Sequence, residues 1–248
     1  MWTLLLGCKV VDAPEDLEEL MVFGFVNTEE RDAFVEETLD GLVPLAELHH
    51  DDLVEGFRVD SLTEGDLLAV GVTTDRKLDV VGVASLVVMS SSVDEMMPLL
   101  AGGNLDGAFE ATIAYTTTDD SDKACFLAHE CDEFRNHGSR TTDAGLLGTA
   151  TQEFDSVFRW VNRADETPAL LLRQLSPKKT EMSVDLVIVH QSYSLAAIFE
   201  HGGETWRLEA YWADAEVVGL DVPDSLALDQ AVSAMATRAE ELDAFLGN

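Results

Sequence analysis

The sequence predicts an α+β fold, in which antiparallel strands are covered by helices. Residues 184–189 form a β-branched run, residues 206–212 alternate apolar with polar side chains, and residues 228–246 carry apolar side chains at helical spacing. The first two patterns are typical of strands and the third of a helix. Because hairpin signals outnumber strand–helix–strand patterns, we expect antiparallel rather than parallel pairing.

A three-stranded meander is expected over residues 184–212. Residues 184–189 and 195–200 are its first two strands, and the polar residues 191–194 between them suggest a turn. Gly202 and Gly203 then favour a tight hairpin, since glycine adopts positive φ without steric cost. In the third strand one face is expected to carry Trp206, Leu208, Ala210 and Trp212, and the other Arg207, Glu209 and Tyr211.

A long amphipathic helix is expected over residues 225–246. Asp224 or Ser225 can cap its start, and Pro223 fits there as well. Its apolar stripe consists of Leu228, Val232, Met235, Ala239, Leu242 and Leu246. A helix of this length spans about 30 Å and can cover a small sheet. The stripe is expected to dock on the meander, and a coiled-coil dimer seam is the alternative.

The earlier part of the chain carries further signals. We expect strands at 3–11, 66–73, 78–89 and 109–117, because these runs are β-branched or alternate in polarity. Helices are expected at 14–20, 27–42, 45–53 and 93–100; Asn27 and Glu30 favour the start of the second. Residues 151–163 predict an amphipathic helix, with Phe154, Val157, Phe158 and Val161 on one side, and residues 169–175 form a short element.

Each half thus contains a hairpin followed by a helix, which suggests two similar subdomains. We place an N-terminal α+β part at 1–140 and a C-terminal part at 141–248, the latter with a helix, the meander and the long helix. A single compact domain is the alternative, since 248 residues suit either arrangement.

The charge is strongly negative, with 48 acidic against 15 basic residues and a net charge of −33. The acidic pairs are spread along the chain rather than gathered in a tail. Such a surface suits a high-salt proteome, in which screening relieves self-repulsion. It also suits a basic partner or imitation of nucleic acid. Direct binding to nucleic-acid phosphates is not expected, because the sign of the charge is wrong.

A cytoplasmic protein with no membrane segment is expected. Three cysteines are too few, and odd in number, for a disulfide-stapled secreted fold. The N-terminus lacks the basic region of a signal peptide. The longest apolar run, residues 80–89, is about half the ~20 residues that a membrane helix needs.

One cluster has metal-ligand chemistry: Cys125, His129, Cys131 and His137 lie within thirteen residues. Two thiolates and two imidazoles suit tetrahedral zinc. On a helix Cys125 and His129 would share a face, so Cys131 could join only if the helix broke near Asp132. The alternatives are buried cysteines with exposed histidines, or a cysteine nucleophile activated by His129, although surrounding acids would raise the thiol pKa.

The sequence carries no phosphate loop, dinucleotide turn or nucleophile elbow. We therefore predict a non-enzymatic, highly acidic protein-binding module without a cofactor, which binds a protein partner or a second copy of itself. A zinc-binding protein using the Cys125, His129, Cys131 and His137 cluster is one alternative. An acidic mimic of nucleic acid is another.

Overall fold

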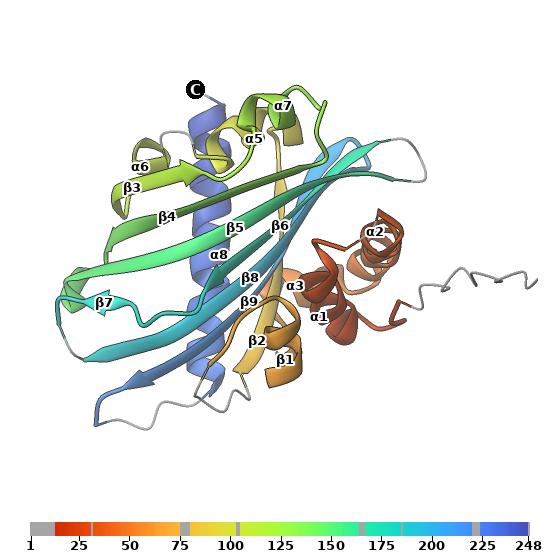
Figure 1. Ribbon diagram of the computed structural model, residues 1–248. Helices are drawn as coiled ribbons and strands as arrows, with labels where there is room; N and C mark the ends of the chain where they lie inside the picture. The colour runs from red at the N-terminus through yellow and green to blue at the C-terminus, as the bar shows by residue number, and fades with distance from the viewer. Residues whose placement is uncertain are drawn as a thin grey trace, which may run out of the picture.

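The computed structural model describes residues 13–30, 32–74, 80–102, 105–163, 167–184, 186–219 and 224–247. Within these ranges nine strands form one antiparallel sheet, with helices on both of its faces (Figure 1). The strand order is β1-β2-β9-β8-β6-β5-β4-β3, and β7 pairs with β5 off this path. The predicted α+β class, with helices covering an antiparallel sheet and a long C-terminal helix, is confirmed.

The sheet takes strands from both sequence-predicted parts. The strands are β1 (Phe57–Leu62), β2 (Val80–Met89), β3 (Thr112–Asp119), β4 (Glu133–Asp143), β5 (Thr149–Asn162), β6 (Pro168–Ser176), β7 (Glu181–Met182), β8 (Val187–His201) and β9 (Glu204–Val217). The described helices are α1 (Leu17–Asn27), α2 (Asp32–Leu48), α3 (His50–Glu55), α4 (Glu64–Ala69), α5 (Val93–Leu100), α6 (Leu105–Ala108), α7 (Lys123–Leu127) and α8 (Asp224–Leu246), with a 3-10 turn η1 (Gly145–Leu147).

Side-chain alternation gives the sheet two buried faces. The first, which we call the α1 face, packs against α1 and α2 through residues such as Leu171, Leu195 and Trp212. The second, the α8 face, packs at one end against α5, α7 and α8 through residues such as Phe158 and Ile198. Each fully buried apolar side chain contributes roughly 1.5–3 kcal/mol, so both cores hold helices firmly to the sheet.

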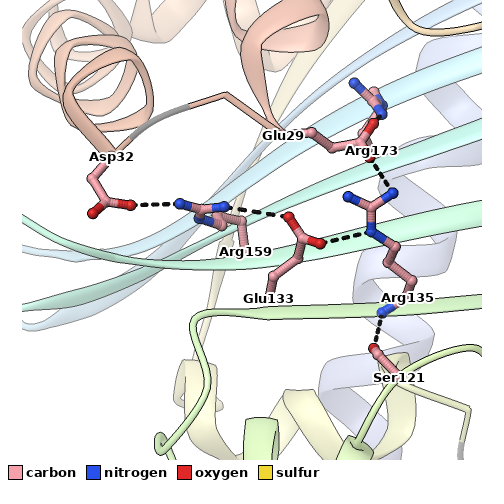
Figure 2. A network of polar contacts seen from close by, with 7 residues as sticks. All are labelled: Glu29, Asp32, Ser121, Glu133, Arg135, Arg159 and Arg173. Carbon is pink, nitrogen blue, oxygen red and sulfur yellow. Dashed lines mark hydrogen bonds and ion pairs between the residues drawn. The ribbon is translucent and has the colours of Figure 1, made fainter.

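A charged network fixes the connection between α1 and α2 to the α1 face (Figure 2). Arg135 lies 2.5 Å from Glu29 and 2.6 Å from Glu133, and Arg159 bridges Glu133 and Asp32 at 3.3 and 2.5 Å. The remaining member, Arg173, is 1% exposed; it contacts Glu29 and donates to the Phe25 carbonyl at 3.1 Å. A buried guanidinium needs such partners, because an unpaired buried charge is costly.

The C-terminal end of α8 is tied to the end of β2. The Asp243 carboxylate accepts hydrogen bonds from the backbone N–H and hydroxyl groups of both Ser90 and Ser91, at 2.7–3.1 Å. This anchor fixes α8 along the sheet immediately before α5 begins. None of the described helices combines the length and apolar character that crossing a membrane requires.

The meander region differs from its prediction in one respect. The turn at Gly202 and Gly203 is confirmed, and both glycines have positive φ. The turn expected at 191–194 is wrong, because these residues continue the single long strand β8. Tyr193 in this segment points into the core of the α1 face. Although its side chains look polar, the segment pairs with β6 on one side and with β9 on the other.

Two other elements were assigned wrongly from the sequence. Residues 151–163 form strand β5 rather than a helix, since Phe158 packs on the α8 face and Val161 on the α1 face. Residues 66–73, expected as a strand, include most of helix α4, which begins with a capping box between Thr63 and Asp66. The strand expected at 3–11 lies outside the described residues.

Candidate functional site

The four residues predicted to bind zinc do not form a metal site. Cys125 and Cys131 are joined by a disulfide, so neither thiolate is free to bind a metal. His129, between them, has a φ of 56°, stacks on Trp160 at 4.1 Å and places Nε2 3.0 Å from the Asp94 carboxylate. Over the residues that the structure describes, no group of three or more His, Cys, Asp or Glu side chains is placed to hold a metal ion.

The fourth predicted ligand, His137, lies on β4 and points to the α1 face. Its Nδ1 is 2.8 Å from the Asp120 carboxylate, and this hydrogen bond raises the pKa of His137 above its ordinary value. His137 also lines a pocket of about 390 Å³ at the edge of the α1 face, with Thr116, Ser139, Glu153, Asp155 and Lys178 among the other lining residues.

The charged groups of this pocket are largely paired already. Lys178 lies 2.5 Å from the Glu153 carboxylate, and that contact raises the pKa of Lys178. With His137 bound to Asp120 as well, a ligand would have to displace existing ion pairs at an exposed site. Exposed ion pairs of this kind contribute little free energy. Because its charges are already paired, the pocket offers a ligand little charge of its own.

The α8 face carries a more distinctive group of residues, which we call the interior polar patch. Its members lie on six strands and on α8: Tyr115, Arg140, Gln152, Gln174, Ser194, Tyr211 and Arg238. Strand pairing places Tyr115 opposite Arg140 and Arg140 opposite Gln152 in one row, and Gln174 opposite Ser194 and Ser194 opposite Tyr211 in another. The hydrogen bond from Gln152 to Ser192 connects the strands of the two rows. All seven are only partly buried.

Arg140 is the central charge of the interior polar patch. It donates to the Gln152 amide oxygen at 3.1 Å, and Gln152 donates in turn to the Ser192 hydroxyl at 2.7 Å. Burial, followed by the charge of Arg238, lowers the pKa of Arg140 to about 10, while Tyr211, Tyr115 and Glu209 oppose this shift. The guanidinium stays charged at neutral pH, but its surroundings favour that charge less than water does.

A buried ion pair borders the interior polar patch on β9. Arg207 donates to one carboxylate oxygen of Glu209 through Nε at 3.1 Å and Nη2 at 2.7 Å. Both residues are buried, yet the Nη1 of Arg207 has no hydrogen-bond partner. A buried donor without a partner costs about 1–3 kcal/mol, which marks this atom as one that a bound group could satisfy.

Sequence reasoning missed this group of residues, although a signal was present. Arg207, Glu209 and Tyr211 were correctly placed on one strand face, but that face was expected to be wet rather than enclosed. The position of Gln152 on the α8 face was not predicted, because residues 151–163 were expected to form a helix. The sequence patterns of β9 and β5 did not indicate that β4 would place Arg140 on the same face of the sheet.

No protein-family model matches this sequence, and no curated protein matches it either. Solved structures with a similar fold include a STAR-related lipid transfer protein fragment from Xanthomonas axonopodis, at 11% identity and a TM-score of 0.46, covering 68% of this chain and 86% of that one. A START superfamily protein from Mycobacterium smegmatis matches at 8% identity and a TM-score of 0.42, covering 67% and 97%. Human StAR-related lipid transfer protein 5 matches at 9% identity and a TM-score of 0.43, covering 68% and 77%.

The prediction of an acidic protein-binding module is wrong, as are its zinc-binding and nucleic-acid-mimic alternatives. At 8–11% identity the likeness concerns the fold alone. What this chain binds has to follow from its own residues.

Proposed function

We propose that the protein binds a small amphipathic molecule on the α8 face, between the central strands and α8. The observation that carries this proposal is an asymmetry between the two faces of the same strands. On the α1 face, Leu171, Leu195 and Trp212 are fully buried, whereas their chain neighbours on the α8 face, Leu172, Ser194 and Tyr211, stay partly accessible. Side chains in the middle of a sheet keep accessible surface only where the covering layer leaves space above them.

The chemistry of this space supports an amphipathic ligand. Leu172 packs at the border of the apolar core, and the Phe154 ring stacks with Tyr115 at 5.5 Å. Amide and hydroxyl groups from Gln174 and Ser194 lie beside them on neighbouring strands. Binding sites for small molecules typically combine apolar walls with a few placed polar groups of this kind. Lipid transfer is what the names of the neighbours above describe, and a lipid-like molecule is the class we propose here.

The neutral fluorescent probe N-phenyl-1-naphthylamine tests this proposal, because its emission rises when it enters an apolar site. We expect saturable binding to the wild-type chain and its loss in Ser194→Trp, where an indole fills the accessible space. The matched control is Gln230→Trp, which places the same ring on the exposed side of α8. Absence of binding to the wild-type chain, or equal binding to both variants, would contradict the proposal.

A cytoplasmic location and self-association stay predictions. Disulfides persist chiefly in oxidising compartments, so alkylation of free thiols at the moment of cell lysis would test the location through the state of Cys125 and Cys131. Sedimentation equilibrium would test for a homodimer.

A further inference from the structure

Basic residues are scarce in this chain, yet three arginines lie on the α8 face or approach it. The sequence has 15 basic residues against 48 acidic ones. Arg140 and Arg207 point into this space from β4 and β9, as their pairing with Gln152 and Ile198 requires. Ile198 belongs to the α8-face core, which fixes the side of the sheet on which Arg207 lies.

Arg238 approaches the same space from α8. Met235, Ala239 and Leu242 form the buried stripe of that helix, and Arg238 lies on one flank of it. Asp243, which binds Ser90 and Ser91 at the end of β2, lies on the other flank. At 100° per residue the two side chains are about 140° apart around the helix axis. Since Asp243 reaches toward β2, Arg238 leans toward the opposite strands, where the charges of Arg238 and Arg140 act on one another.

Of the groups whose charges act on Arg140, Arg238 is a guanidinium and Glu209 is the one carboxylate. Glu209 is already used by Arg207, which leaves Arg140 and Arg238 without a carboxylate partner in the described contacts. The buried Nη1 of Arg207 adds a donor with no acceptor. In a protein with a net charge of −33, an enclosed surplus of positive charge is not explained by general surface chemistry.

We propose, building on the proposed function, that the bound molecule carries an anionic head group, a carboxylate or a phosphate, which binds between Arg140 and Arg238 within reach of Arg207. Guanidinium groups bind both anions through paired N–H donors. The apolar portion of the molecule then lies against Leu172 and Phe154. The head group neutralises the surplus charge and gives Arg207 Nη1 the acceptor that it lacks.

Two probes with one shared body separate this proposal from the previous one. The anionic probe is 8-anilinonaphthalene-1-sulfonate, and N-phenyl-1-naphthylamine is its neutral counterpart. We expect Arg140→Gln and Arg238→Gln each to weaken the binding of the sulfonate about tenfold, the loss expected for one charge-assisted hydrogen-bonded contact, and to leave the neutral probe unaffected. Arg238→Lys should restore part of the lost affinity because it restores the charge.

The control variant is Arg58→Gln, which removes the same charge from the exposed edge strand β1. Displacement of the neutral probe by dodecanoate, dodecyl phosphate and dodecanol identifies the head group. We expect both anions to displace it at roughly tenfold lower concentration than the alcohol does. The anion that binds more tightly indicates whether the natural head group is a carboxylate or a phosphate.

The outcomes are distinguishable. If the neutral probe binds but the two interior variants weaken the sulfonate no more than Arg58→Gln does, the anionic head group is wrong and the proposed function stands. If dodecanol displaces the probe as well as the anions do, the conclusion is the same. If neither probe binds the wild-type chain, the proposed function fails and this inference fails with it.

Discussion

Arg140 of β4 lies on the α8 face, and burial, followed by the charge of Arg238 on α8, lowers its pKa to about 10. Like charges in a partly buried setting destabilise the ligand-free fold. Natural binding sites often carry such a cost, which the ligand then relieves.

This relationship predicts a gain in stability when one charge is removed. Arg238→Gln should raise the free energy of unfolding of the ligand-free chain by about 0.5–1 kcal/mol relative to Arg58→Gln, since the control corrects for the change in net charge. Urea denaturation measures both variants. A purely structural Arg238 would instead make Arg238→Gln the less stable of the two.

The anchor of α8 predicts acid sensitivity. Burial raises the pKa of Asp243, but the hydrogen bonds from Ser91 and Ser90 outweigh this and lower it below its ordinary value. A carboxyl with a lowered folded-state pKa stabilises the fold above its unfolded-state pKa, and this contribution is lost as pH falls through the folded value. Asp243→Asn should therefore cost about 1 kcal/mol at neutral pH. The difference from wild type should shrink below about pH 4, and a difference that is constant with pH would contradict this role.

The ion pair between Glu29 and Arg173 predicts that substitutions of its two members lower the free energy of unfolding by different amounts. Glu29→Ala leaves the buried Arg173 without its carboxylate, so the free energy of unfolding should fall by about 3–5 kcal/mol. Arg173→Met removes the charge and keeps the volume, and should cost less than half as much. Urea denaturation of both variants measures the ratio, and a larger loss for Arg173→Met would show that packing against Phe25, not charge pairing, dominates here.

The disulfide between Cys125 and Cys131 closes a short loop that holds His129 on Trp160. Closing so short a loop stabilises a fold by roughly 2 kcal/mol. A reducing agent should lower the melting temperature of the wild-type chain and change its tryptophan fluorescence. The doubly substituted Cys125→Ser, Cys131→Ser chain should melt at the temperature of the reduced wild-type chain, with or without the reductant. A wild-type melting temperature that the reductant leaves unchanged would contradict a stabilising role of the disulfide.

His137 should titrate above the ordinary histidine range, because its hydrogen bond to Asp120 raises its pKa. A group with a raised folded-state pKa stabilises the fold at low pH and loses that contribution as pH rises through the folded value. NMR titration of the imidazole resonances measures the midpoint. In Asp120→Asn the midpoint should return toward the ordinary value; no movement would assign the shift to another group.

The sequence predicted the fold class, strand β9 and helix α8 well, since the stripe of α8 and the alternation in β9 each face a single core. It failed at β5 for a physical reason. Phe158 is buried on the α8 face and Val161 on the α1 face, so a strand covered on both sides loses its alternation and imitates helical spacing.

The failure at residues 191–194 is connected with the candidate site. Ser192 and Ser194 look like turn residues because their hydroxyl groups are polar, but they are strand residues on the α8 face of β8. Strands with polar side chains on an enclosed face break the local rules from which a sequence is interpreted, and such exceptions are expected at binding sites. Arg140, Arg207 and Arg238 belong to three elements distant in sequence, so no local pattern indicates that they are turned to the same layer.

The central claim, binding between the sheet and α8, is tested most directly by NMR chemical-shift mapping with N-phenyl-1-naphthylamine. Shift changes should concentrate at Gln174, Ser194 and Tyr211 and on α8 near Arg238. Changes centred on His137 and Lys178 would instead place the ligand in the pocket on the α1 face. That result, or the absence of any change, would contradict the account.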